Sequence, residues 1–303
     1  MTDTAAVLGA GGVGGFVAAA LARSGAEVVV VARPDTAAAL DIAEGLRVSS
    51  RALGEDFTAR PRVATELGAP VDVLFVATKA RGLADALERV TATPRLAVPL
   101  LNGVEHLEVL RARFGADRVA AAVIRIESDR PAAGVIVQTS PGVRVDMAPP
   151  PGLPERAVDG ADALLRGAGI EVRIDDSEPR VMWSKLARLC ALALTTSASD
   201  RPIGYVRSDP RWRSALEGAV SETVAVANAE GAGLAAADTL AELDAAHAEL
   251  GSSMQRDIAA GRPTELDAIA GAVLRAGQRH GLRCPTVQWL AERVALREAR
   301  AVA

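Results

Sequence analysis

The chain has a glycine-rich turn near its beginning whose backbone could bind phosphate groups. The turn follows an apolar run that we predict as a strand, and it fits the pattern G-x-G-x-x-G with Gly9, Ala10, Gly11, Gly12, Val13 and Gly14. In such a turn Gly9 permits the tight bend, Gly11 lets the backbone approach a pyrophosphate, and Gly14 lets the next helix pack close to the strand. The amino end of that helix presents unpaired N–H groups and a partial positive charge. Between a strand and a helix, the motif predicts a dinucleotide-binding turn.

The end of the next apolar run indicates which dinucleotide would bind. Domains that bind NAD usually carry an Asp or Glu there, roughly 20 residues beyond the glycines, to hold the ribose hydroxyls. Here the place is taken by Ala32-Arg33. An acid would repel a 2′-phosphate, whereas the Arg33 guanidinium could hold one through charge-assisted hydrogen bonds. We therefore expect NADPH rather than NADH, the alternative being that Arg33 is an ordinary surface arginine in a loop.

Two further polar residues follow predicted strands. Lys79 comes just after the run Val71–Ala77, and Asn102 comes directly after Leu96–Leu101. Ligands of open α/β sheets gather at the carboxyl ends of the strands, so both side chains are candidates for the ligand site. A solvent-exposed lysine is the simpler interpretation of Lys79. Asn102-Gly103 is also a turn signal in its own right.

Strand and helix patterns alternate through the first part of the chain. Besides the two strands already given, apolar runs occur at Ala5–Gly9 and Glu27–Ala32, with helical patterns between them. Such runs are typical of parallel strands covered on both faces, joined by right-handed crossovers. Further short strands are predicted at Val119–Ile126, Gly134–Gln138, Val143–Met147 and Ile170–Ile174.

From Pro179 onward the pattern changes to Ala- and Leu-rich helical stretches with no convincing strand. The sequence thus predicts two domains. Residues 1–178 form a Rossmann-type α/β domain with a mostly parallel sheet that binds NADP, and residues 179–303 form an all-α domain for substrate binding and catalysis.

The composition excludes several classes of protein. The 303 residues are 50% hydrophobic and carry a formal net charge of −4, which argues against binding to nucleic acid phosphates. No apolar stretch is long enough to span a membrane, and no signal-peptide pattern opens the chain. The cysteines, Cys190 and Cys284, are too few for a disulfide framework, so we expect a cytoplasmic protein. We expect no metal site. Apolar helices of the second domain could supply a homodimer contact.

Taken together, the motifs resemble those of the ketopantoate reductases (2-dehydropantoate 2-reductases). The resemblance extends over nearly the whole chain, and its motifs occur in the family's order and near its spacing. They are Gly9–Gly14 with Arg33, Thr78-Lys79, Leu101-Asn102-Gly103-Val104, Trp183-Ser184-Lys185-Leu186, Ser252-Ser253-Met254 and Thr264-Glu265-Leu266-Asp267.

This resemblance implies that NADPH reduces the ketone of a small 2-oxo acid, as in pantothenate biosynthesis, with Lys185 as general acid. A cationic donor suits that step because an ammonium can stabilise and then protonate the developing alkoxide. Alone, Lys185 would be interpreted as a surface lysine on a helix. The resemblance also places Lys79 near the cofactor and Asn102 near the nicotinamide and the substrate.

Two more segments of the helical domain match motifs of the family. Ser253 would offer its hydroxyl to the substrate carboxylate, with Ser252 as a rival for the same role. Glu265 would lie in the first turn of a helix capped by Thr264, where a carboxylate is stabilised, so its role is either catalytic or helix-capping.

The chain departs from the family at three positions that usually hold asparagines. They are Leu189, Ala193 and Leu250 here. Their replacement makes the expected pocket wall more apolar. Either the substrate is a less hydroxylated oxo acid, or an arginine, Arg188 or Arg125, takes over recognition of its carboxylate. His106, one turn past Asn102, is a further candidate, although a single histidine is more often structural.

Two alternative functions remain open. One is an NADPH-dependent reductase of a different, less polar carbonyl or imine. The other is a non-catalytic protein that senses NADP(H). Such a sensor would need only the glycine turn and Arg33, so the joint presence of Lys185, Asn102, Ser253 and Glu265 favours an enzyme.

Overall fold

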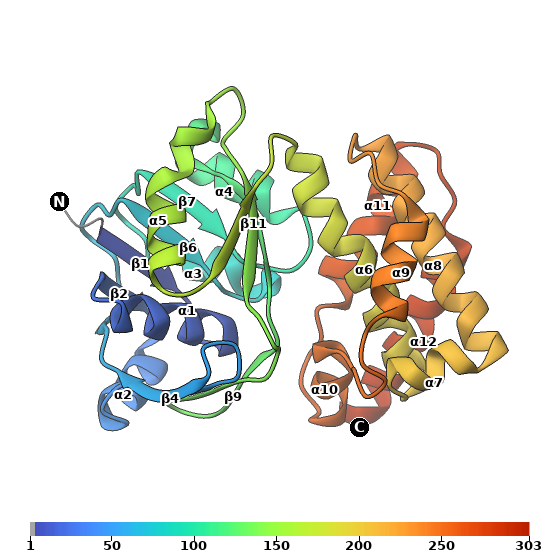
Figure 1. Cartoon of the computed structure of the whole chain (residues 1–303), viewed down its shortest axis with the longest axis horizontal. Coiled ribbons are helices and arrows are strands. Elements are labelled where there is room, and N and C mark those ends of the chain that lie inside the picture. The colour runs from blue at the N-terminus through green and yellow to red at the C-terminus, as the bar shows by residue number, and fades with distance from the viewer. Residues whose placement is uncertain (1–3, 303) are drawn as a thin grey trace. The chain divides into compact units, whose positions relative to one another are not determined.

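The structure is a computed structural model that describes residues 4–302 (Figure 1). It divides into two compact units. The first runs to Leu101 and resumes over His106–Glu178, and the second consists of Asn102–Glu105 with the residues from Pro179 onward. The placement of Asn102–Glu105 differs from the expected division, because this short segment packs with the helical unit through contacts described below.

The first unit contains a five-stranded parallel sheet in the order β5-β2-β1-β6-β7. Its strands are β1 (Thr4–Leu8), β2 (Glu27–Val31), β5 (Arg62–Ala64), β6 (Val73–Val76) and β7 (Leu96–Pro99). In β1 and β2 the last four residues are all buried, as expected of strands covered on both faces. The predicted Rossmann-like architecture is confirmed.

Helix α1 (Gly12–Arg23) follows the glycine turn and is buried from Gly14 to Leu21. It packs on β1 and β2 of the parallel sheet and also against a second sheet, of order β4-β3-β10-β9. The strands of this second sheet are β3 (Leu46–Ser50), β4 (Glu55–Ala59), β9 (Ser128–Ala132) and β10 (Val135–Gln138). The first helix is therefore held between two sheets, which fixes the direction in which its amino end points.

A third sheet has the order β12-β11-β8. It comprises β8 (Ala121–Arg125), β11 (Arg144–Ala148) and β12 (Glu171–Ile174). These strands, and β10 of the second sheet, lie within two residues of their predicted bounds. The unit's remaining helices are α2 (Pro34–Ile42), α3 (Leu83–Leu87), α4 (His106–Phe114) and α5 (Asp159–Gly167), with short 3-10 turns at Ala80–Gly82, Ala116–Arg118 and Glu155–Val158.

Four strands were not predicted: β3, β4, β5 and β9. Strand β3 has the alternating burial of a strand with one covered face, but its sequence LRVSS carries few apolar residues. Strand β9 lies at a sheet edge, is almost wholly exposed and contains Pro131. An edge strand tolerates proline, so its sequence carries little strand signal.

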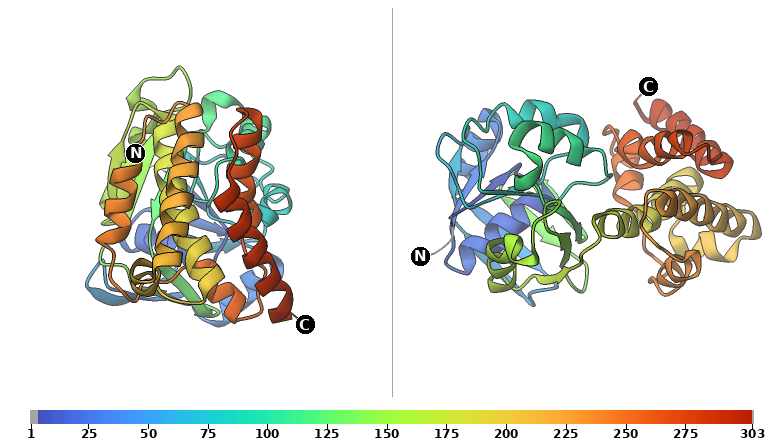
Figure 2. Two further views of the ribbon diagram at one scale, coloured as in Figure 1. Left: turned by 90° about the vertical axis from the view of Figure 1, so that its right-hand side faces the viewer. Right: turned by 90° about the horizontal axis from the view of Figure 1, so that it is seen from above.

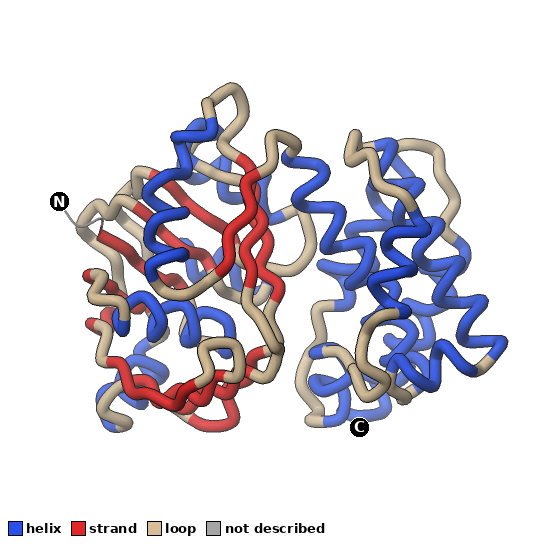
Figure 3. The backbone as a smooth tube through the Cα atoms, in the orientation of Figure 1, coloured by secondary structure: helices blue, strands red, loops and turns tan. Residues whose placement is uncertain are grey.

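The second unit consists of helices joined by loops, with no strand among its described residues, and Figure 3 shows strands only in the first unit. Its helices are α6 (Glu178–Ser199), α7 (Ile203–Ser208), α8 (Pro210–Ala229), α9 (Ala236–Asp244), α10 (Ser253–Ala259), α11 (Ala272–Arg279) and α12 (Pro285–Val302), with a π-helical turn, η4 (Asp267–Gly271), before α11. The long helices α8 and α12 pack on each other (Figure 2). None of the helices in the described part of the chain combines the length and apolarity needed to cross a bilayer.

Candidate active site

The glycine turn has the backbone geometry that requires glycine. Gly9 has φ +105°, and a Cβ there would lie 2.8 Å from the Ala77 carbonyl oxygen. Its N–H donates to the Val31 carbonyl oxygen at 2.9 Å, which ties the turn to β2. A Cβ on Gly14 would lie 2.0 Å from the Gly9 carbonyl oxygen. These two positions therefore allow α1 to begin directly against the end of β1.

The amino end of α1 is suited to a phosphate group. Gly11 is its N-cap residue, which supplies no side-chain cap, and the first turn holds no acidic residue. A Cβ on Gly11 would meet no atom within 4 Å, so space lies open over the backbone there. The first N–H groups of a helix lack intrahelical partners and attract anions. The residues present thus fit the pyrophosphate of a dinucleotide.

Arg33 and Lys79 lie at the same edge of the parallel sheet as the glycine turn. Strand β1 pairs in parallel with β2 on one side and with β6 on the other. Arg33 follows β2 as the N-cap residue of α2, and Lys79 follows β6 as the N-cap residue of the next 3-10 turn. Both residues are exposed. One cation thus stands on each side of the glycine turn.

In the second unit a hydrogen-bonded chain joins three of the predicted residues. The Lys185 ammonium donates to Asn102 Oδ1 at 2.8 Å, and Asn102 Nδ2 donates to Glu265 Oε2 at 2.9 Å. Lys185 lies on α6, Asn102 begins the segment 102–105, and Glu265 directly precedes Leu266, where the next helix begins. Lys185 and Glu265 are both partly exposed. The amide thus connects an ammonium to a carboxylate.

The segment that carries Asn102 is held closely against η4. Gly103 has φ +86°, and a Cβ there would lie 2.4 Å from the Ala268 carbonyl oxygen. Glu105 receives two hydrogen bonds of 2.7 Å from Arg275 of α11. Sequence reasoning missed both Glu105 and Arg275, because nothing in the local pattern links residues so far apart in the chain.

Glu265 is positioned through its neighbour Thr264. The Thr264 N–H and hydroxyl donate to the two carboxylate oxygens of Glu298 on α12, at 2.8 and 2.9 Å. The Thr264 hydroxyl oxygen also accepts from the Leu266 N–H at 3.3 Å. The helix begins at Leu266, so the prediction that Glu265 lies in its first turn is wrong: Glu265 lies just before it, and Thr264, one residue earlier still, bonds the first helical N–H. Glu298 was not predicted as a site residue. Its bonds to Thr264 hold the residues before Leu266 against α12.

The two predicted serines have different surroundings. Ser252 is buried and is the N-cap residue of α10, where its hydroxyl oxygen accepts from the Gln255 N–H at 3.1 Å. Thr196 of α6 donates to the same oxygen at 3.0 Å. Ser253 is exposed. The Ser252 hydroxyl is thus engaged within the fold, whereas that of Ser253 lies at the surface.

The candidate arginines are each paired with an acid. Arg188, on α6 three residues beyond Lys185, lies 3.6 Å from a carboxylate oxygen of Glu242. Arg125, at the end of β8, donates to Asp146 at 3.0 Å, and Arg144 forms a second ion pair with the same carboxylate at 2.7 Å. Arg125 therefore shares its acid with another arginine. His106 is buried at the start of α4.

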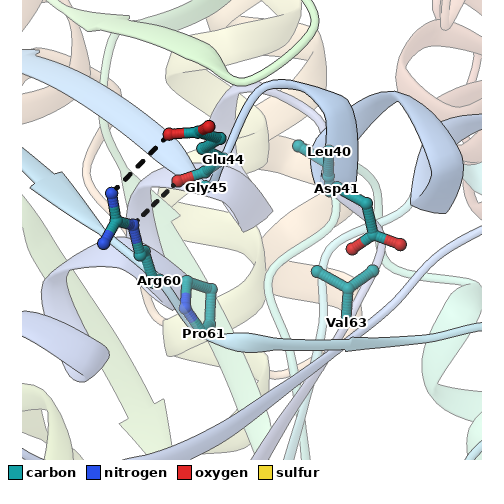
Figure 4. Close-up of a pocket in the computed structure, with 7 residues that line it drawn as sticks. All are labelled: Leu40, Asp41, Glu44, Gly45, Arg60, Pro61 and Val63. Atoms are coloured by element: carbon teal, nitrogen blue, oxygen red, sulfur yellow. Dashed lines mark hydrogen bonds and ion pairs between the residues drawn. The ribbon is translucent and has the colours of Figure 1, made fainter.

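None of the predicted site residues lines the pocket shown in Figure 4. That pocket, of about 390 Å³, lies between the end of α2 and the turn around Pro61, where Arg60 donates to the Glu44 carbonyl oxygen. In the part of the chain that the structure describes, no group of three His, Cys, Asp or Glu side chains could hold a metal ion.

Comparison with known proteins identifies related families and folds. Residues 5–151 match the family model described as ketopantoate reductase PanE/ApbA, and residues 179–298 match ketopantoate reductase PanE/ApbA C terminal. The chain is 34% identical to a 2-dehydropantoate 2-reductase of Caulobacter vibrioides over 92% of its own length and 94% of the relative. It is 27% identical to the uncharacterized oxidoreductase YkpB of Bacillus subtilis, over 97% and 98%.

Solved structures share the whole architecture. A PanE/ApbA family ketopantoate reductase from Ralstonia eutropha JMP134 superposes with a TM-score of 0.86 at 25% identity, over 99% of this chain and 100% of that one. D-mandelate dehydrogenase, solved with NADH and anilino(oxo)acetate, shares the fold with a TM-score of 0.89 at 20% identity, over the same fractions. On the two family models and the 34% identity, the chain belongs to the ketopantoate reductase family.

Proposed function

We propose that this protein catalyses the NADPH-dependent reduction of a small 2-oxo acid to the 2-hydroxy acid, with Lys185 as general acid. The observation that carries the proposal is the hydrogen-bonded chain Lys185–Asn102–Glu265. Relatives named 2-dehydropantoate 2-reductase support the reaction class. A chain that only sensed the cofactor would have no need of this arrangement.

A reductase of this family uses a pyridine nucleotide, which when bound supplies a hydride to the carbonyl carbon. The glycine turn would hold its pyrophosphate at the amino end of α1, with Lys79 close by. Arg33 would contact the 2′-phosphate, because a guanidinium binds a phosphate through charge-assisted hydrogen bonds. NADPH is therefore the proposed cofactor, and the proposed contact of Arg33 with the 2′-phosphate would select it over NADH.

In the proposed mechanism Lys185 holds and then transfers a proton. An ammonium has three N–H donors, so it can bond Asn102 and a ketone oxygen at the same time. The developing alkoxide is stabilised by the ammonium charge and takes its proton from Nζ. The neutral amine then regains a proton from water, which can reach it because Lys185 is partly exposed.

Asn102 and Glu265 would keep this ammonium in place. Asn102 Oδ1 accepts from the ammonium and so fixes the direction of Nζ. Because Asn102 Nδ2 is bonded to Glu265, the amide is held with its oxygen toward the lysine. The Glu265 carboxylate thus orients the lysine through Asn102 rather than by contact with it.

We assign the substrate carboxylate to Ser253 and Arg188. The Ser253 hydroxyl lies at the surface beside the buried cap Ser252. Arg188 lies less than one turn from Lys185 on α6, and its ion pair with Glu242, at 3.6 Å, is long. A carboxylate substrate could bond the guanidinium in two places. Ser252 is a weaker candidate because its hydroxyl caps α10.

The test is the oxidation of NADPH by the purified protein in the presence of a panel of 2-oxo acids. Turnover with at least one of them is the expected result. If NADPH binds tightly and every 2-oxo acid is inert, the reductase proposal is wrong and the NADP(H)-sensing alternative is favoured.

A further inference from the structure

Within about 40° of the direction of Lys185, α6 carries no polar side chain over its next two turns, and Arg188, the proposed carboxylate ligand, lies about 60° to one side. At about 100° per residue, Leu189, Leu192 and Thr196 all lie within roughly 40° of the direction of Lys185. Thr196 is the first of these with a hydroxyl, and that oxygen lies 2.7 Å from the Leu192 carbonyl oxygen and 3.0 Å from Ser252 Oγ. The first polar group on this face is thus already committed to contacts within the fold.

Leu189 is the member of this face that a ligand can reach. It is partly exposed, whereas Leu192 and the neighbouring Ala193 are buried. A helical side chain leans toward the amino end of its helix, so Leu189 covers the turn that carries Lys185. At the i, i+4 spacing on one helix face, Leu189 is therefore expected to lie beside Lys185, the proposed proton donor.

In the segment that leads into α10, Leu250 adds an apolar side chain. Leu250 is buried, two residues before Ser252, whose hydroxyl contacts Thr196 on the same face of α6. The backbone of Leu250 is engaged within the fold, since its N–H donates to the His247 carbonyl oxygen at 3.0 Å and its carbonyl oxygen accepts from the Ile203 N–H at 2.9 Å. The side chain of Leu250 offers no hydrogen bond to a ligand, and its N–H is already bonded.

We infer that the preferred substrate is a 2-oxo acid in which the remaining group on the ketone carbon is branched aliphatic or aromatic and carries no hydroxyl. The inference rests on the proposed function and separates this chain from relatives that act on 2-dehydropantoate, which carries a hydroxyl on C4. A hydroxyl placed against Leu189 would lose its hydrogen bonds to water and gain none. An apolar wall rejects an added hydroxyl by roughly ten- to a hundredfold in kcat/KM.

Two acids that differ at one hydroxyl provide the test. They are 3,3-dimethyl-2-oxobutanoate and its 4-hydroxy derivative, which is 2-dehydropantoate. We expect the full-length protein with NADPH to favour the first by at least about tenfold in kcat/KM. Equal values, or a preference for the hydroxylated acid, would overturn the inference and leave the proposed function intact. If neither acid, nor any other of the panel, is reduced, the proposed function fails and this inference fails with it.

A pair of variants then assigns the preference to Leu189. Leu189→Asn should move the ratio of the two kcat/KM values toward the hydroxylated acid by about tenfold, since an amide can bond the hydroxyl. Leu189→Met keeps an apolar side chain of similar volume and should keep the preference. Because Leu189 is partly exposed, both variants are expected to fold, which thermal melting would verify. An unchanged ratio in Leu189→Asn would show that another group sets the preference.

A second inference comes from a different observation, the ion pairs of Arg275. From α11 this guanidinium forms two hydrogen bonds of 2.7 Å to Glu105 and one of 2.7 Å to Asp267. The two carboxylates hold the pKa of Arg275 above its ordinary value. Glu105 ends the segment that begins at Asn102, and Asp267 begins η4, two residues after Glu265.

We propose that Arg275 is a positioning residue for the Lys185–Asn102–Glu265 chain. By binding Glu105 at two points and Asp267 at a third, it ties the segment of Asn102 to the helix that begins beside Glu265. The close approach of Gly103 to Ala268 holds the same segment against η4 at a second point. If Arg275 no longer bound Glu105, the Asn102 side chain could turn away from Lys185. The proposed cofactor residues, the glycine turn, Arg33 and Lys79, would be unaffected.

Arg275→Lys tests this role, because lysine keeps the positive charge but lacks the planar guanidinium that binds both oxygens of a carboxylate at once. We expect kcat to fall about tenfold and the alkaline limb of its pH profile, which reports Lys185, to move, while the Kd for NADPH stays within about twofold. Glu105→Gln should show a smaller loss of kcat in the same direction.

Arg213→Lys is the matched control. Arg213 of α8 binds both Asp244 and Glu217, so its replacement breaks a similar network elsewhere in the same unit. It should lower the melting temperature without moving the pH profile. A native kcat and profile in Arg275→Lys, or the same losses in Arg213→Lys, would reduce Arg275 to a structural residue and overturn the proposal.

Discussion

The ammonium of Lys185 donates a 2.8 Å hydrogen bond to the side chain of Asn102, although 83 positions separate them in the chain. The same amide also bonds Glu265, which lies 163 positions from Asn102 in the chain. All three belong to the same compact unit, because Asn102–Glu105 packs with the helices rather than with the sheet that precedes it. The proposed proton donor and the groups that orient it thus form one body.

The first prediction concerns the proton donor. Lys185→Ala should lower kcat by about 10²- to 10⁴-fold, the usual contribution of a general acid, and leave the Kd for NADPH nearly unchanged. Turnover and cofactor fluorescence would measure the two quantities. Lys79→Ala is the informative comparison, since it should weaken cofactor binding more than catalysis. Wild-type turnover in Lys185→Ala would remove this lysine from the mechanism.

A second prediction concerns the choice of cofactor. Arg33→Ala should weaken NADPH binding by roughly ten- to a hundredfold, the worth of a charge-assisted hydrogen bond, and change NADH binding by less than about twofold. Titration calorimetry with both nucleotides would measure this. Arg156→Ala, another exposed arginine of the same unit, should change neither. If both nucleotides weaken equally, some other group must contact the 2′-phosphate.

The glycine turn allows binding and stability to be separated. Gly11→Ala places a methyl in open space, so the melting temperature should hardly change, while NADPH binding weakens at least about tenfold because the methyl blocks the approach of the pyrophosphate. Gly14→Ala forces a methyl to within 2.0 Å of the Gly9 carbonyl oxygen and should destabilise the fold by about 1–3 kcal/mol. Thermal melts with and without NADPH distinguish the two. Identical behaviour of both variants would contradict the assigned roles.

The cysteines yield a prediction about reactivity and pH. Burial raises the pKa of the Cys190 thiol to about 12, and it also raises the pKa of Cys284. An acid with a raised pKa stays protonated to higher pH, and the neutral thiol is a poor nucleophile. In the folded protein neither thiol should react with a disulfide reagent at mildly alkaline pH, and both should react in denaturant. Rapid labelling of the native protein would show that one thiol is accessible or ionised.

Local sequence patterns determined four of the five strands of the parallel sheet, all but β5, and the helical second half. Four-residue apolar runs such as Val28–Val31 can be satisfied only when covered on both faces, so their positions predict parallel strands without knowledge of the rest. The glycine motif Gly9–Gly14 can likewise be recognised from the local sequence, since the tight turn and the space over its backbone depend on a few adjacent residues. Strands β3 and β9 escaped prediction because a half-exposed or edge strand is stabilised by its partners, which the local sequence does not contain.

Tertiary structure alone decided what holds the candidate catalytic residues. Lys185, Asn102 and Glu265 could be named from motifs, but their order in a hydrogen-bonded chain could not. The same is true of Arg275 and Glu105, which lie 170 positions apart, and of Glu298, which holds Thr264. These are pairs of ordinary charged residues with no local pattern. Which acid meets which base depends on how the helices of the second unit pack, and that packing is set by the whole buried core at once.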